Sequence, residues 1–182
     1  MPRSFDLSAE SPANVDEVLA AFCDENYWRA RLAAFGTGPP AATLDSLIVD
    51  VDGTVQVATT LRLVRDRLPP LVNQLGRGDL HMVHTETWSR VAGKQVRGQI
   101  GIAVPGTPVS AAAAALLAPL GEGSRLKYRA TVKVKVPWVG GKIESFMSGR
   151  LADGIMDIQR FTTAWICENG RPAKGQRSGW SV

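Results

Sequence analysis

The chain has 182 residues, of which 45% are apolar and 21% are charged, and these values are typical of one globular domain with a sizeable core. The formal net charge is +4 at pH 7, and no zinc-finger spacing, helix-turn-helix signal or aromatic RNA-binding motif accompanies it, so we do not expect nucleic acid as a partner. No run of 18 uncharged apolar residues occurs and the first residues lack the apolar core of a signal peptide, which predicts a soluble cytoplasmic protein.

The first part of the chain predicts a strand followed by two helices. Residues 4–9 alternate apolar and polar side chains, which is typical of a short strand. Ser11 and Pro12 then predict the N-cap and the first position of a helix, and Asp24 predicts the cap of a second helix. That second helix carries an apolar stripe interrupted by one cation: Tyr27, Trp28, Arg31, Leu32 and Phe35.

A strand pattern begins at Leu44. Leu47, Val49 and Val51 alternate with acidic residues, which predicts that these three side chains share one face. The dipeptide Asp52-Gly53 predicts a tight hairpin turn, after which residues 55–63 form the returning strand.

The middle of the chain predicts further strands. Residues 65–78 form a mixed connection, and residues 80–91 and 94–104 predict a second hairpin. The run Ala111–Leu117 consists of good helix formers, but it is short and lies between proline-rich and glycine-rich turns. We therefore predict that this segment is a strand.

The most informative feature is the junction between residues 125–136 and the helical pattern that follows. Even positions from Leu126 to Val136 are apolar and odd positions are polar or basic, which predicts a long strand with one buried face. Pro137 ends this strand because it has no amide proton to donate. Apolar residues from Ile143 to Trp165 then recur at helical spacing, so a long C-terminal helix must follow.

The order of elements predicts an α+β fold in which helices pack on one face of an antiparallel sheet. This order resembles that of the START-like, or SRPBCC, superfamily with its helix-grip, Bet v 1-like fold. More narrowly, the sequences Pro105-Gly106-Thr107-Pro108 and Val136-Pro137-Trp138-Val139-Gly140-Gly141-Lys142 resemble the DUF2505 family of unknown function within it. The resemblance implies a curved sheet of about seven strands wrapped around the C-terminal helix, with a ligand cavity between them. We predict one START-like domain over residues 1–168. Residues 169–182 are rich in Gly, Arg, Lys and Ser, which predicts a flexible basic tail.

Several residues predict a hollow interior. Gly149 and Gly154 lie inside the C-terminal helix, where each costs about 1 kcal/mol relative to Ala, so their missing side chains must provide space or close approach. The alanine run supplies only methyl groups to the opposite wall. The alternative is that helix and sheet pack closely and fill this space. We predict that the cavity is lined by Trp28, Met82, His84, Glu86, Trp88, Phe146, Met147, Arg150 and Gly154.

His84 and Glu86 are the candidates for chemistry. They lie two residues apart on the predicted strand over residues 80–91, so they share a face about 6.6 Å apart. A histidine beside a carboxylate forms an acid/base unit near neutral pH, and the alternatives are an internal hydrogen-bonded pair or a polar anchor for a bound ligand. Cys23 and Cys167 show no metal-ligand spacing, so we expect buried free thiols, no metal and no cofactor.

The charge is concentrated on one strand. Residues 125–142 contain six Lys or Arg and no Asp or Glu, and five of them occupy odd positions of the strand: Arg125, Lys127, Arg129, Lys133 and Lys135. The sequence therefore leaves three functions open. The first is binding of a hydrophobic small molecule, either a lipid or a polyketide-like compound. The second is a cyclase- or dehydratase-type enzyme that uses His84 and Glu86, and the third is attachment to an anionic membrane through the basic face.

Overall fold

The computed structural model describes residues 3–35, 42–63, 80–135 and 140–170, except for the side chains of residues 140, 142, 143, 146 and 147. The elements follow the predicted order of a strand, two helices, six strands and a long helix. They are β1 (Arg3–Ser11), α1 (Val15–Phe22), α2 (Glu25–Phe35), β2 (Ala42–Val49), β3 (Val55–Leu63), β4 (Leu80–Val91), β5 (Gln95–Ala103), β6 (Val109–Leu120), β7 (Gly123–Val134) and α4 (Gly140–Asn169).

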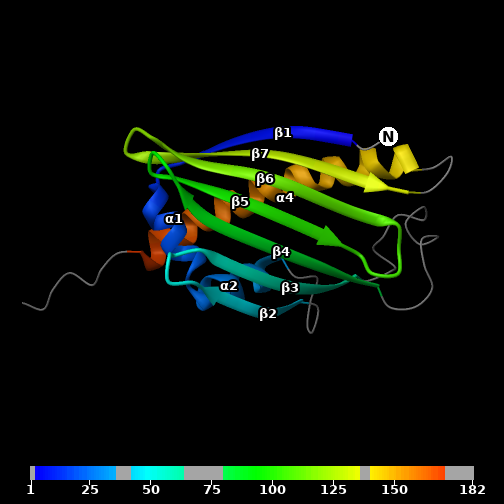
Figure 1. Ribbon diagram of the computed structural model, residues 1–182, viewed down its shortest axis with the longest axis horizontal. Coiled ribbons are helices and arrows are strands. Elements are labelled where there is room, and N and C mark those ends of the chain that lie inside the picture. Colours follow the sequence, from blue (N-terminus) through cyan, green and yellow to red (C-terminus); the bar gives the residue numbers. More distant parts are fainter. Residues whose placement is uncertain (1–2, 36–41, 64–79, 136–139, 171–182) are drawn as a thin grey trace, which may run out of the picture.

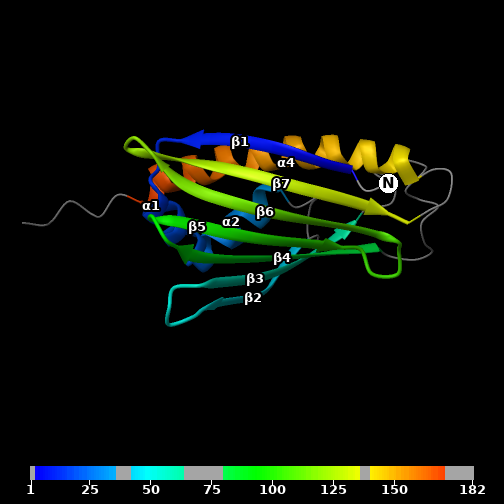
Figure 2. The same cartoon turned by 45° about the horizontal axis from the view of Figure 1, so that its top comes forward.

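The seven strands form one antiparallel sheet in the order β1-β7-β6-β5-β4-β3-β2. The first strand pairs with the last, so β1 and β2 are the two edges. Figures 1 and 2 show that α4 runs along the sheet beside β1 and β7, while α2 lies toward the other edge beside β2, and α1 lies at one end of the sheet next to the C-terminal part of α4. The curved sheet and its long C-terminal helix confirm the predicted α+β helix-grip fold.

The alanine-rich segment is a regular strand, as predicted. Ala111 to Ala115 pair without interruption with β5 on one side and β7 on the other. Ala111 and Ala115 are buried, whereas Ala112 and Ala114 are exposed. Helix propensity favours a helix here, but pairing on both edges satisfies every backbone group of a central strand, and this tertiary context prevails.

The predicted alternation of β7 is also observed. Leu126, Ala130, Val132 and Val134 are buried, and the polar odd positions face outward. Ser11 of β1 and Ser124 of β7, which pair with each other, are also buried. The residues predicted for the corner after β7, and the tail beyond residue 170, lie outside the described residues, as does the connection over residues 65–78.

The helix boundaries differ from the prediction in one respect. Asn14, and not Ser11, caps α1: its side chain accepts a hydrogen bond from the backbone of Glu17, and the Glu17 carboxylate accepts one from the backbone of Asn14. Ser11 stays in β1 because it pairs with Ser124 of β7. Asp24 lies at the start of α2 as predicted, and its carboxylate accepts a hydrogen bond from the backbone of Asn26.

The β2–β3 hairpin also corrects the prediction. Its turn lies at Gly53, as expected, with a φ of +80°. The pairing of β2 shifts between Leu44 and Ser46, and Val49 pairs with the buried Val55 beside the turn. Val49 and Val51 are nevertheless exposed at this end of the edge strand, and of the three residues predicted to share one face only Leu47 packs against the core.

The aromatic core fills one end of the interior. Trp28, Trp88 and Tyr27 are each no more than 1% exposed, and the Phe22 ring lies 4.8 Å from that of Trp88. The Trp88 ring covers Gly98 so closely that a Cβ there would lie 2.5 Å from a ring carbon. This packing leaves the space farther along α4 to smaller side chains.

Both cysteines are free thiols, but the burial predicted for them is wrong at one position. Cys23 is half-buried and packs against the core, whereas Cys167 is exposed on α4. In the described helices, no stretch is both long and apolar enough to cross a lipid bilayer.

Candidate functional site

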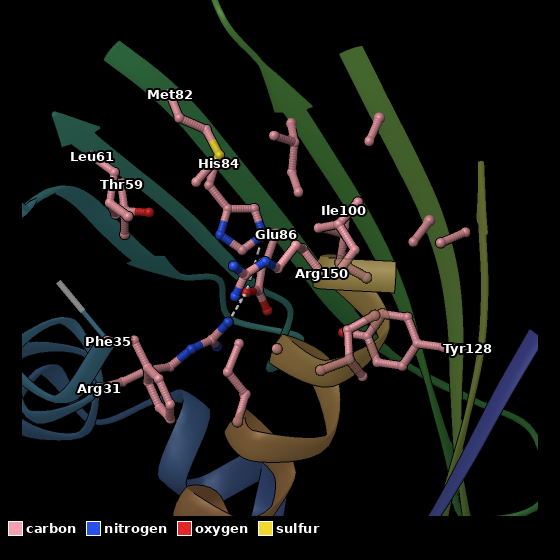
Figure 3. Close-up of a pocket in the computed structure, with 18 of the residues that line it drawn as sticks. Arg31, Phe35, Thr59, Leu61, Met82, His84, Glu86, Ile100, Tyr128 and Arg150 are labelled. Carbon is pink, nitrogen blue, oxygen red and sulfur yellow. Dashed lines mark hydrogen bonds and ion pairs between the residues drawn. The ribbon is translucent and has the colours of Figure 1, made fainter. Parts of the chain in front are cut away.

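A pocket lies between the inner face of the sheet and the helices α2 and α4. Its volume is about 190 Å³, and its walls are mainly apolar. Figure 3 shows the strands on one side and the helices on the other, with side chains converging between them. The residues that define its apolar wall include Leu32, Leu61, Met82, Ile100, Ile102, Leu151, Ile155 and Ile158.

Small residues make the pocket possible. Ala111 and Ala113 contribute to the sheet wall with no more than a methyl group each. On the helix wall, a Cβ built at Gly154 would meet no atom within 4 Å, so the space in front of this glycine is open. Gly149 also faces open space, but it is exposed and lies outside the pocket wall. The glycine that contributes to the pocket is therefore Gly154.

A buried ion pair defines the polar part of the pocket. Arg31 of α2 donates a hydrogen bond from Nη2 to Oε1 of Glu86 on β4, at 2.7 Å. The side chains of Arg31 and Glu86 are only 10% and 3% exposed. Trp88 donates from Nε1 to the second carboxylate oxygen, also at 2.7 Å, and the Arg31 guanidinium lies 4.8 Å from the centre of the Trp28 ring. Both oxygens of Glu86 are thus already hydrogen-bonded within the protein.

His84 lies beside this ion pair. Its Nε2 is 3.5 Å from Oε1 of Glu86, and Figure 3 shows Arg150 extending from α4 toward the same two residues. Burial lowers the pKa of His84, and the nearby Arg31 cation lowers it further, although Glu86 acts in the opposite direction. His84 is therefore a neutral imidazole near pH 7.

Glu86 remains ionised for a different reason. Burial alone raises the pKa of a carboxyl group, but here the Arg31 cation, His84 and the hydrogen bond from Trp88 more than offset burial and hold the pKa of Glu86 below its usual value. The carboxylate thus serves as the fixed partner of Arg31.

The predicted site residues are only partly brought together. Six of them line the pocket: Trp28, Met82, His84, Glu86, Arg150 and Gly154. Trp88 does not, because its ring packs on Phe22 and Gly98 in the core, and only its indole nitrogen reaches the site. The side chains of Phe146 and Met147 lie outside the described part of the structure.

Sequence reasoning missed three polar residues of the pocket, namely Arg31, Thr59 and Tyr128. Arg31 had a visible signal, because it is the one cation within the apolar stripe of its helix. Such a position predicts a buried partner of opposite charge. Thr59 and Tyr128 occupy inward positions on their strands, in line with apolar inward residues, and nothing in the sequence distinguishes them from ordinary core positions.

The predicted basic face carries less positive charge than the sequence indicates. Arg125 forms an ion pair with Glu10 at 2.8 Å, and Arg129 forms one with Asp6 at 2.8 Å, because β1 lies antiparallel beside β7. The three lysines, at positions 127, 133 and 135, are exposed. Two of the five cations are thus neutralised by the neighbouring strand, which weakens the electrostatic case for an anionic membrane. Attachment to a membrane stays a prediction.

Comparison with solved structures supports the class of fold. Norcoclaurine synthase from Thalictrum flavum, solved in complex with dopamine and hydroxybenzaldehyde, is similar with a TM-score of 0.53 and 16% identity, over 94% of this chain and 90% of that one. The Zhui aromatase/cyclase from Streptomyces sp. R1128 is similar with a TM-score of 0.55 and 11% identity, over 96% and 99% of the two chains. These likenesses show that the chain has the helix-grip fold of Bet v 1-like proteins.

Sequence comparison gives the particular family. DUF2505, a family of proteins of unknown function, matches residues 6–166. An uncharacterized protein of Mycobacterium tuberculosis is 42% identical over 176 residues, which cover 93% of this chain and 99% of the relative. An uncharacterized protein of Mycobacterium bovis matches to the same extent. The chain therefore belongs to the DUF2505 family.

Proposed function

We propose that this protein binds a small hydrophobic molecule in the pocket between the sheet, α2 and α4. The observation that supports this function best is the open space in front of Gly154 and the alanine run, within walls that are mainly apolar. A glycine in the interior of a helix is unfavourable by about 1 kcal/mol relative to alanine. Space for a ligand gives a reason for its presence, because filling the pocket with a side chain would otherwise stabilise the fold.

The volume restricts the size of the ligand. Pockets for drug-sized ligands span roughly 300–1,000 Å³, whereas an engineered cavity of about 150 Å³ accommodates benzene. The volume of about 190 Å³ lies just above the second value. We therefore propose a compact ligand of about one or two rings in place of a long-chain lipid or a large polyketide.

A pair of glycine variants tests the proposal. Gly154→Leu places a side chain inside the pocket, whereas Gly149→Leu places the same side chain on the exposed part of the same helix. Both changes replace a glycine inside a helix by a good helix former, so both gain helix propensity. A difference in ligand binding between them therefore reports on the pocket alone.

The binding of a neutral bicyclic compound, 2-acetylnaphthalene, is measured by isothermal titration calorimetry. We expect wild-type protein and Gly149→Leu to bind with similar affinity, and Gly154→Leu to bind at least tenfold more weakly. Equal binding by both variants, or no binding by the wild-type protein, would exclude the proposed pocket as the site. Native mass spectrometry of purified protein, followed by organic extraction, identifies any ligand that it carries.

The arrangement of Glu86 favours binding over acid/base catalysis. Its two carboxylate oxygens accept hydrogen bonds from Arg31 and Trp88, and its lowered pKa keeps it ionised, so it has no proton to donate near neutral pH. The cyclase- or dehydratase-type alternative therefore depends on His84 alone as a base. This alternative stays a prediction, and loss of turnover in His84→Ala with retained ligand binding is the result that would support it.

A further inference from the structure

The chain has two tyrosines, and their hydroxyl groups are used differently. Tyr27 is fully buried, and its hydroxyl forms a hydrogen bond of 2.7 Å with the hydroxyl of Thr162 on α4. Tyr128 lies on β7 in the wall of the pocket, and within the described part of the chain no hydrogen bond to its hydroxyl is formed. The Tyr128 side chain is half-buried, and a tyrosine hydroxyl that faces an apolar pocket usually has a hydrogen-bond partner. The hydroxyl of Tyr128 therefore needs one from another source.

We propose that the hydroxyl of Tyr128 donates a hydrogen bond to an oxygen atom of the ligand, so the ligand is an oxygenated ring compound with a carbonyl group and not a pure hydrocarbon. This inference rests on the proposed function, because it assigns the polar contact of the same pocket. Figure 3 shows the Tyr128 ring on the opposite side of the pocket from Arg31, with Glu86 between them and the Tyr128 hydroxyl directed toward the interior.

The surroundings make Tyr128 a donor. Burial raises the pKa of Tyr128, and the nearby Glu86 carboxylate raises it further, although Arg31 acts in the opposite direction. The side chain is therefore a neutral phenol near neutral pH. A phenol that stays protonated has one proton to donate, and a carbonyl oxygen accepts it without bringing a charge into an apolar pocket.

A second hydroxyl lies in the pocket and provides an internal comparison. Thr59 of β3 is 3% exposed, lines the pocket and is paired with His84 on the neighbouring strand. It belongs to the part of the sheet that carries Glu86, whereas Tyr128 lies on β7, with β4, β5 and β6 between the two strands. Within the described residues the Thr59 hydroxyl also forms no hydrogen bond, so it is the competing donor. A ligand of one or two rings with one carbonyl group contacts one of these hydroxyls, and we assign that contact to Tyr128 because its hydroxyl is directed toward the interior of the pocket.

Two compounds of nearly equal shape test the assignment. In 2-acetylnaphthalene a carbonyl group replaces the methylene group of 2-ethylnaphthalene, so the pair differs mainly in one hydrogen-bond acceptor. A site that contains an unpaired donor discriminates against a ligand that leaves this donor unsatisfied. We expect wild-type protein to bind the ketone about tenfold more tightly than the hydrocarbon.

Three variants then locate the donor. Tyr128→Phe keeps the ring and removes the hydroxyl, so we expect its preference for the ketone to fall to less than threefold. Tyr27→Phe makes the same change in the tyrosine whose hydroxyl is bonded to Thr162, and Thr59→Val removes the other pocket hydroxyl. We expect both of these variants to retain the tenfold preference.

Thermal unfolding of the ligand-free variants separates a ligand contact from a structural one. If the Tyr128 hydroxyl has no partner in the free protein, Tyr128→Phe leaves the Tm unchanged or raises it, whereas Tyr27→Phe lowers the Tm by breaking a buried hydrogen bond. A fall in Tm for Tyr128→Phe as large as that for Tyr27→Phe would overturn the inference.

The outcomes distinguish this inference from the proposed function. If wild-type protein binds both compounds equally, or if Thr59→Val and not Tyr128→Phe loses the preference, the assignment of Tyr128 is wrong while the pocket remains the binding site. If Gly154→Leu fails to weaken either compound, or if neither compound binds, the proposed function fails and this inference fails with it.

Discussion

Replacing Arg31 with leucine removes the cation that neutralises Glu86 inside the protein. The two side chains are 10% and 3% exposed, and their hydrogen bond is 2.7 Å long. Leucine keeps much of the apolar contact of the arginine stem but cannot pair with the carboxylate. The variant therefore leaves Glu86 buried with the indole of Trp88 and His84 as its remaining polar neighbours.

The expected loss is large. Removing one partner of a buried ion pair costs about 3–5 kcal/mol, because the remaining charge stays out of water without compensation. A domain of ordinary stability has an unfolding free energy of roughly 5–15 kcal/mol, so the change removes a substantial share. With a urea dependence of about 2 kcal/mol per molar, the unfolding midpoint falls by about 2 M.

The loss depends on pH with a definite sign. In the wild-type protein the pKa of Glu86 is lowered, so this residue contributes stability above its unfolded pKa, and that contribution is lost as the pH falls through its folded pKa. Without Arg31, burial dominates and raises the pKa of Glu86. As the pH falls, Glu86 of the variant becomes protonated and neutral, and the loss of stability caused by its buried charge decreases. The difference between wild type and Arg31→Leu is therefore largest near pH 7 and smaller near pH 4.5.

Urea unfolding, followed by tryptophan fluorescence at both pH values, measures this difference. Arg29→Leu is the matched control, because Arg29 lies on the same helix and forms an exposed ion pair with Glu25. We expect that control to cost less than about 1 kcal/mol. We also expect Arg31→Leu combined with Glu86→Gln to be more stable at pH 7 than Arg31→Leu alone. A loss below about 1 kcal/mol for Arg31→Leu, or a loss that does not shrink in acid, would refute the reasoning.

Two further predictions concern the scaffold. Gly98→Ala places a Cβ 2.5 Å from the Trp88 ring, so we expect the free energy of unfolding in urea to fall by about 1–3 kcal/mol. The Cβ of Gly149→Ala meets no atom within 4 Å, so we expect this variant to gain up to about 1 kcal/mol, and equal midpoints for the two variants would contradict this packing. Asn14→Ala removes the cap of α1 and its reciprocal bond with Glu17, so we expect a loss of about 1 kcal/mol, and an unchanged midpoint would show that the cap contributes nothing.

Local patterns in the sequence determined the elements and most of their boundaries. The alternation after Leu126 predicted β7 because side chains on a strand point to opposite faces, and only one face of this strand is buried. Asp52-Gly53 predicted the first hairpin because glycine adopts the positive φ that the turn requires. Where two local signals competed, as for Ser11 and Asn14, the pairing of β1 with β7 decided which residue caps the helix.

The polar part of the pocket depended on contacts between residues far apart in the chain. Sequence periodicity placed His84 and Glu86 on one face of β4, but it could not show that Arg31, 55 residues earlier, would meet Glu86. It also could not show that Trp88 would pack on Gly98, or that Tyr27 would have a hydroxyl partner and Tyr128 none within the described chain. Periodicity specifies which way a side chain points, whereas its partner depends on how the sheet curves and where the helices pack on it.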